Sequence, residues 1–92
     1  MLNKENWLIG QKCFYINRFI PEEVEILNVY EADESFAEIE IDAESEYDPS
    51  MHVDCYDLYL TFNEAFEVAK MQLFRTQTEL ILAKEEYNKK DK

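Results

Sequence analysis

Three residues of types that bind metals or take part in catalysis lie close together in the sequence, His52, Asp54 and Cys55. Cys13 could join them across the fold, and histidine, aspartate and cysteine are side chains that hold zinc. Their spacing matches no closed Cys/His pattern, and the CxxC pair that structural zinc sites favour is missing. We therefore expect no metal site, with His52 facing solvent and both cysteines reduced in the core. The sequence leaves a disulfide between them open, because that depends on geometry.

The remaining polar residues form no recognisable catalytic set. Any two of the many carboxylates could be proposed as an acid/base pair, and the sequence singles out none. The serines in the acidic turns have no histidine partner in their sequence context. Gly10 is the only glycine, which excludes a glycine-rich phosphate-binding loop. We expect a protein that is not an enzyme and that needs no cofactor.

The charge of the chain is concentrated in its middle. Residues 19–69 contain sixteen aspartates and glutamates but no lysine or arginine, and all nine basic residues lie outside this block. A folded domain normally mixes both signs, because unopposed like charge destabilises the compact state. The block therefore predicts a surface that repels nucleic acid and membranes and attracts a basic protein. The residues expected to form this surface are Glu31, Asp33, Glu34, Glu38, Glu40, Asp42, Glu44, Glu46 and Asp48.

Two alternatives to a binding surface remain at the level of sequence. The acidic residues could form a solvated face that serves solubility only. Residues 44–48 could also hold a divalent cation weakly, although the spacing and the glycine of an EF-hand loop are missing.

Length and composition indicate one small folded domain spanning residues 1–92. The net charge of −12 would suit a disordered chain, but 47% hydrophobic and 14% aromatic residues argue for a packed core. No apolar run approaches the roughly 18 residues of a membrane span. The N-terminus also lacks the basic start and apolar core of a signal peptide. We therefore expect a cytoplasmic protein.

Four strands are predicted, at residues 11–16, 24–30, 36–43 and 51–56. The clearest is the third, in which Ile39 and Ile41 alternate with acidic residues. One face of this strand should enter the core, and the other should carry carboxylates about 6.6 Å apart. Residues 17–23 contain Pro21 and are expected to form a connection. Residues 57–60 could be a fifth strand or a single helical turn.

A long helix is predicted over about residues 62–88. Thr61, with Glu64 three residues later, matches a capping box, and no glycine or proline interrupts the segment that follows. Apolar and small residues recur along it at spacings of three and four: Phe62, Phe66, Ala69, Leu73, Thr76, Leu80, Ala83 and Tyr87. Such a helix would measure about 39 Å and would run past a domain of about 25 Å.

The apolar residues beyond the domain edge would need a partner. We expect an antiparallel homodimer, because the spacing suits a second helix and the simplest pair is two-fold symmetric. Its predicted interface consists of Leu73, Leu80, Ala83 and Tyr87. In the competing outcome the helix bends or the sheet is more extended, and the protein is a monomer.

Two short segments resemble the SH3-like small β-barrels. Residues 7–16 resemble their opening, in which a hydrophobic segment and a glycine precede a basic and then two aromatic residues. Residues 57–65 look like the end of short uncharacterised bacterial and phage barrel proteins, in which an Asp-Leu-aromatic strand runs into a Thr-x-x-Glu-Ala helix cap. The resemblance covers residues 7 to about 70 and implies a fold without an activity.

Together these patterns predict an α+β protein. We expect a small SH3-like β-barrel or a bent antiparallel sheet of four to five strands over about residues 7–60, with the helix after it. The leading functional hypothesis is an acidic protein that occupies a basic, nucleic-acid-binding surface of another protein. Phage or mobile-element inhibitors of restriction or CRISPR nucleases would be proteins of this kind. The alternative is an assembly module that forms homo-oligomers through the helix, with acidity that only aids solubility.

Overall fold

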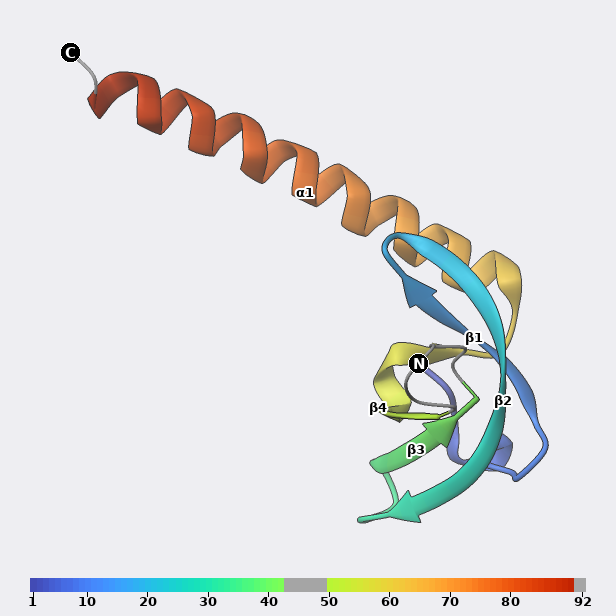
Figure 1. The fold of residues 1–92 in the computed structure, drawn as a ribbon. Coiled ribbons are helices and arrows are strands. Elements are labelled where there is room, and N and C mark those ends of the chain that lie inside the picture. The colour runs from blue at the N-terminus through green and yellow to red at the C-terminus, as the bar shows by residue number, and fades with distance from the viewer. Residues whose placement is uncertain (43–49, 91–92) are drawn as a thin grey trace.

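The strands and the helix that the sequence predicts are present in the computed structural model, which describes residues 1–42 and 50–90. A five-stranded antiparallel sheet, curled into a half-barrel, is followed by one long helix (Figure 1). The strands are β1 (Lys12–Asn17), β2 (Ile20–Glu31), β3 (Ala37–Ile41), β4 (Met51–Asp54) and β5 (Leu58–Tyr59), and the helix is α1 (Phe62–Lys90). The α+β class and the bent sheet are thus confirmed.

The sheet curls around its longest strand, β2. The strand order is β4-β3-β2-β1-β5, and the two halves of β2 have different partners. Residues 20–25 of β2 pair with β1, and residues 26–31 pair with β3. The register shifts between Ile26 and Asn28, which is typical of a β-bulge that increases local twist. A short 3₁₀ turn, Cys55–Asp57, then links β4 to β5 at the opposite edge of the sheet.

The connection predicted at residues 17–23 is too long. The chain turns within two residues, Arg18 and Phe19, whose φ angles are 50° and 68°. Two positive φ angles in a two-residue loop make a tight hairpin that follows the natural twist of the strands. Pro21 therefore lies inside β2, opposite Ile16 and outside the part of β2 that pairs with β3. There its missing N–H leaves no gap in the ladder with β3.

The core lies on the concave side of the sheet and begins earlier than predicted. Ile39 and Ile41 are fully buried, as their alternation predicts. Leu2 is only 1% exposed, although the barrel or sheet was expected to begin at about residue 7. Its N–H donates to the carbonyl of Cys55 at 3.0 Å, and its carbonyl accepts the indole N–H of Trp7 at 2.9 Å. These two bonds fix the N-terminal segment across the open side of the sheet.

Cys13 and Cys55 lie in this core as free, buried thiols, as predicted. Burial, and to a smaller extent the nearby Asp42 carboxylate, raises the pKa of the Cys13 thiol from 9.0 to about 11. The thiol therefore stays protonated at neutral pH, and we expect it to react slowly while the protein is folded.

The helix α1 starts at the predicted cap and continues past the sheet. The Thr61 hydroxyl accepts the Glu64 N–H at 3.2 Å, which is the threonine half of a capping box. Ala65 and Ala69 are buried where α1 packs on β1, β2 and β5. Every residue from Lys70 to Lys90 is exposed, and α1 projects away from the sheet (Figure 1). In the part of the chain that is described, no helix is both long and apolar enough to span a membrane.

Candidate acidic binding face

The strand register brings two rows of side chains together on the outer face of β2, β3 and β4. Val29, Ile39 and Val53 form one row that faces inward, so the residues on either side of them face outward. The first outward row is Asn28, Glu40 and His52, and the second is Tyr30, Glu38 and Asp54. We call these six residues the acidic face.

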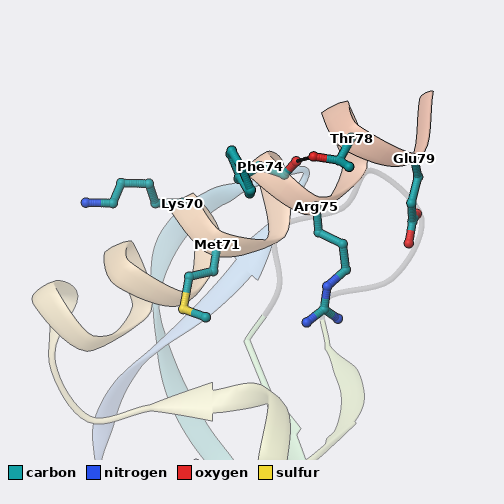
Figure 2. A pocket seen from close by; sticks show the side chains of 6 residues that line it. All are labelled: Lys70, Met71, Phe74, Arg75, Thr78 and Glu79. Atoms are coloured by element: carbon teal, nitrogen blue, oxygen red, sulfur yellow. Dashed lines mark hydrogen bonds between the residues drawn. The ribbon is translucent and has the colours of Figure 1, made fainter. Parts of the chain in front are cut away.

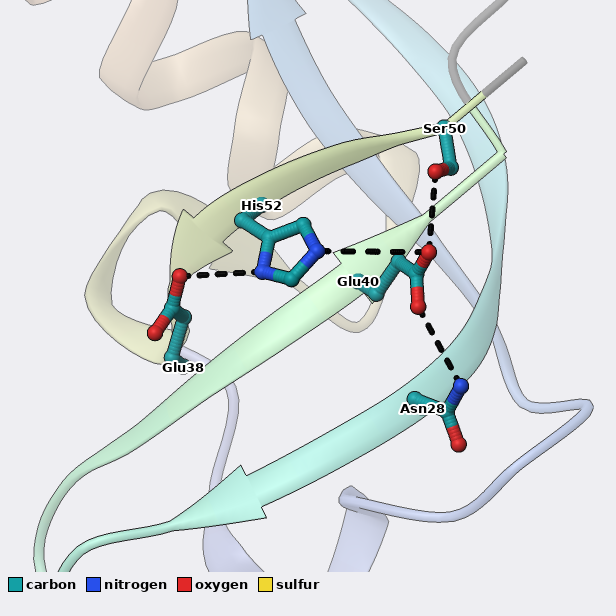
Figure 3. Close-up of polar contacts among 5 residues, drawn as sticks. All are labelled: Asn28, Glu38, Glu40, Ser50 and His52. Atoms are coloured by element: carbon teal, nitrogen blue, oxygen red, sulfur yellow. Dashed lines mark hydrogen bonds and ion pairs between the residues drawn. The ribbon is translucent and has the colours of Figure 1, made fainter.

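The His52 ring lies between the carboxylates of Glu38 and Glu40, as Figure 3 shows. Its Nδ1 is 3.0 Å from Oε1 of Glu38, and its Nε2 is 3.9 Å from Oε2 of Glu40. Its ring stacks on Tyr30, with ring centres 5.5 Å apart and planes 13° apart. Stacking and the shorter contact to Glu38 together fix the orientation of the imidazole ring.

Glu40 is the best anchored carboxylate of the face. Its oxygens accept the Asn28 side-chain N–H at 3.2 Å and the Ser50 hydroxyl at 2.8 Å (Figure 3). The hydrogen bond from Asn28 is the main reason why the pKa of Glu40 lies below its usual value, followed by the bond from Ser50. Glu40 is therefore ionised at neutral pH and held in one orientation.

Glu38 and Asp54 lie directly opposite each other on β3 and β4, and both are exposed. Opposed side chains in an antiparallel ladder have their Cβ atoms about 4.5–5.5 Å apart, and like charges at such a position destabilise the sheet. A guanidinium or ammonium group between the two carboxylates would be bound by both. The two exposed carboxylates therefore make this part of the outer face negative.

Two of the predicted acidic residues at the end of β2 and in the turn after it have partners within the chain. Glu31 forms an ion pair with Lys4 at 2.8 Å. Asp33 accepts the N–H of Ser35 at 2.7 Å and that of Phe36 at 2.9 Å. The hydrogen bond from the Ser35 N–H is the main reason why the pKa of Asp33 lies below its usual value. Asp33 therefore shapes the turn that joins the two strands, whereas Glu34 beside it is exposed.

Asp42 follows β3 and contributes to the fold more than to the surface. Its carboxylate accepts the N–H of Glu25, and its own N–H donates to the carbonyl of Glu25 at 3.1 Å. Asp42 is partly buried. The predicted carboxylates therefore differ in role. Glu38 is exposed and contacts the His52 side chain on the outer face, whereas Asp42 is bonded to the backbone of the neighbouring strand. Glu44, Glu46 and Asp48 lie outside the described residues.

Comparison of the chain with protein-family models, curated proteins and solved structures gave no match.

Sequence reasoning missed four members of the acidic face: Asn28, Tyr30, His52 and Asp54. The alternation of residues 51–56 did indicate that His52 and Asp54 share one side of a strand, and His52 is exposed as predicted. What the sequence does not contain is the pairing of β4 with β3, which brings His52 beside Glu40 and Asp54 beside Glu38. Within residues 1–42 and 50–90, no group of three or more His, Cys, Asp or Glu side chains is arranged to hold a metal ion.

The predicted helical interface lies far from this face, on the free part of α1. Leu73 is 42% exposed, Leu80 is 70% exposed and Tyr87 is 65% exposed. Ala83 is exposed as well. These residues are available for a partner, and the homodimer through them remains a prediction.

Proposed function

We propose that this protein is a non-enzymatic binding protein that occupies a basic, nucleic-acid-binding surface of another protein through its acidic face. The observation that carries the proposal is the exposed pair of opposed carboxylates, Glu38 and Asp54. Two like charges at a paired position destabilise the isolated protein, and a cationic partner would remove that cost.

The distribution of charge over the whole chain supports the same function. Residues 1–61 hold fifteen acidic and three basic residues, whereas residues 62–92 hold six of each. The net charge of −12 thus belongs entirely to the sheet part. A concentrated field of one sign speeds the encounter with a partner of opposite sign and disfavours partners of the same sign, such as nucleic acid.

The proposed partner is a protein whose own basic surface binds DNA or RNA. Such surfaces present lysine and arginine side chains at positions suited to phosphates, and fixed carboxylates can meet the same side chains. Binding would then block the nucleic acid from that surface. An inhibitor of a restriction or CRISPR nuclease would be one protein of this kind.

A comparison of two charge-neutral variants tests the proposal. Glu38→Gln/Asp54→Asn removes two charges from the acidic face, and Glu22→Gln/Glu23→Gln removes two exposed charges from the part of β2 that pairs with β1. Each variant and the wild type serve as immobilised bait in an extract of the natural host, at low salt. Retained proteins are identified by mass spectrometry, and the retention is repeated with added duplex DNA.

We expect one or more basic proteins that the wild type and the Glu22/Glu23 variant retain, that duplex DNA displaces, and that the Glu38/Asp54 variant loses. Retention should also fall with added salt, because the Debye length shortens to about 8 Å at physiological ionic strength. Equal retention by both variants would exclude the acidic face as the binding site. If duplex DNA does not displace the retained proteins, the acidic face does not bind their nucleic-acid-binding surface.

A further inference from the structure

The free part of α1, residues 70–90, forms an arm that no other described segment of the chain covers. At 1.5 Å per residue it extends about 31 Å beyond the sheet, and every one of its residues is exposed. Six large apolar side chains on it are more than half exposed: Met71, Phe74, Leu80, Ile81, Leu82 and Tyr87. Monomeric proteins rarely leave so much apolar surface on one element.

The two sides of the arm differ in how freely a partner can reach them. Ala65 and Ala69 mark the side that packs on the sheet. Because successive residues turn by about 100° around a helix, Leu80 and Tyr87 lie on the same side as Ala69. The far end of an antiparallel helix that packed on this side of α1 would run into the sheet. The opposite side, which carries Met71 and Phe74, is open along the whole of α1.

Among the described residues, the open side of the arm carries a hollow. Its volume is about 670 Å³, and its lining residues are Lys70, Met71, Phe74, Arg75, Thr78 and Glu79. All six come from α1 (Figure 2), so no other element closes the hollow. It has an apolar floor and a rim with two cations and one anion. A single helix cannot enclose a small ligand, and this shape instead fits a second helix laid across it.

The charges of α1 indicate that the second helix is another copy of α1. They form four groups whose net charge alternates in sign, negative, positive, negative and positive: Glu64 and Glu67; Lys70 and Arg75; Glu79, Glu85 and Glu86 with one lysine, Lys84; Lys89 and Lys90. An antiparallel copy of the same helix, centred between Gln77 and Thr78, places each group opposite a group of the other sign. A parallel copy in register places every group opposite itself.

We propose that two copies of this chain associate through the open side of α1 in an antiparallel, two-fold symmetric pair. With the centre at residues 77–78, Phe74 of one copy faces Ile81 of the other, and Met71 lies beside Leu82 of the other. Symmetry repeats each contact, so the hollow of each copy is filled by apolar side chains of its partner. This interface is distinct from the sequence-predicted one, which lies on the sheet side.

The same register pairs the charges at the rim. Lys70 of one copy lies opposite Glu85 of the other, and Arg75 lies one position from Glu79 of the other. These exposed pairs contribute little to affinity, but their signs select the orientation. An antiparallel arrangement also separates the two sheet parts, each of which carries the whole net charge of its chain. A parallel pair would bring these two negative bodies together.

The oligomeric state of two matched variants tests which side of α1 is used. Phe74 and Leu80 are equally exposed, at 71% and 70%, and neither can be needed for folding. Phe74→Gln should weaken dimerisation by about tenfold or more, because it removes a large apolar contact, and Leu80→Gln should leave it nearly unchanged. Sedimentation equilibrium over a concentration series measures both, with circular dichroism to confirm helix content. A wild type that is monomeric at high micromolar concentration overturns the proposal, and so does a dimer that depends on Leu80 but not on Phe74.

The relative orientation of the two helices is tested separately with a spin label on Asn88→Cys. The native cysteines, Cys13 and Cys55, are buried and should take up little label. The wild type gives the background. In the antiparallel pair the two labels lie about 30 Å apart along the helices. In a parallel pair they lie about 10 Å apart, the usual distance between packed helices. A distance distribution centred near the shorter value contradicts the antiparallel arrangement.

Discussion

Glu38 on β3 lies directly opposite Asp54 on β4, with both carboxylates on the solvent side of the sheet. Glu38 has His52 within 3.0 Å, and the Asp54 side chain makes no capping bond to the 3₁₀ turn that follows it. The two acids are thus neighbours because of strand pairing alone. Their mutual repulsion lowers the stability of the isolated protein.

The first prediction concerns this repulsion. Asp54→Asn should raise the free energy of unfolding by about 0.2–1 kcal/mol at low salt, since it removes one of two like charges at a paired position. The gain should shrink as salt screens the pair. Urea unfolding at low and high ionic strength measures both effects. Glu23→Gln, opposite the uncharged Phe14, is the control and should give a smaller gain. A loss of stability in Asp54→Asn would show that Asp54 has a structural partner.

The second prediction concerns the alkaline range. The pKa of Cys13 is about 11 in the folded state, against 9.0 for a thiol that is not buried. Between these values the unfolded chain has lost the thiol proton and the folded chain retains it. The unfolded state then binds fewer protons, so stability is complete below pH 9.0 and falls as the pH rises, by up to about 1.4 kcal/mol per unit.

Cys13→Ala provides the control, because it lacks the thiol while all other titrating groups remain. Urea unfolding of both proteins is measured at about pH 8 and about pH 10. The free energy of unfolding should fall more for the wild type than for Cys13→Ala between these two pH values. Equal losses in both proteins would mean that burial does not suppress the ionisation of Cys13.

The third prediction concerns acid. The pKa of Asp33 lies below its usual 3.8, chiefly because the carboxylate accepts the N–H of Ser35. Above pH 3.8 the carboxylate is ionised in both states, and its stabilising effect is complete. As the pH falls below that value the unfolded state takes up the proton first, so the effect is lost.

Asp33→Asn keeps an acceptor oxygen but cannot titrate, so it isolates this effect. The wild type should melt at a higher temperature than Asp33→Asn at neutral pH, and the difference should close as the solution becomes more acidic than pH 3.8. A difference that stays constant into acid would contradict the prediction.

The fourth prediction concerns the hairpin between β1 and β2. Arg18 and Phe19 both have positive φ angles, which cost residues other than glycine and asparagine about 1–2 kcal/mol each. Replacing them with Asn-Gly, the pair that this turn favours, should raise stability by about 1 kcal/mol and the melting temperature by about 4–8 °C. Alanine at both positions removes the same side chains without relieving the backbone, and should not stabilise the protein.

Several features of the fold are determined by the sequence itself, because they depend on neighbours along the chain. The alternation around Ile39 and Ile41 identifies β3 and its buried face. The cap at Thr61, with no helix-breaking residue after it, identifies α1 and shows that it is longer than the sheet. The separation of charge between residues 1–61 and 62–92 is likewise visible in the sequence.

Other features depend on which segments meet in space, and only the tertiary structure decides them. The place of Leu2 in the core follows from its bond to Cys55, more than fifty residues away. The tight turn at Arg18 and Phe19 gives no signal in a sequence without glycine or asparagine there, because strand pairing on both sides imposes it. The acidic face is decided by register, since a shift of one residue would turn His52 and Asp54 inward. The same holds for α1: its apolar residues are read from the sequence, but the packing of Ala65 and Ala69 on the sheet decides which of them remain open to a partner.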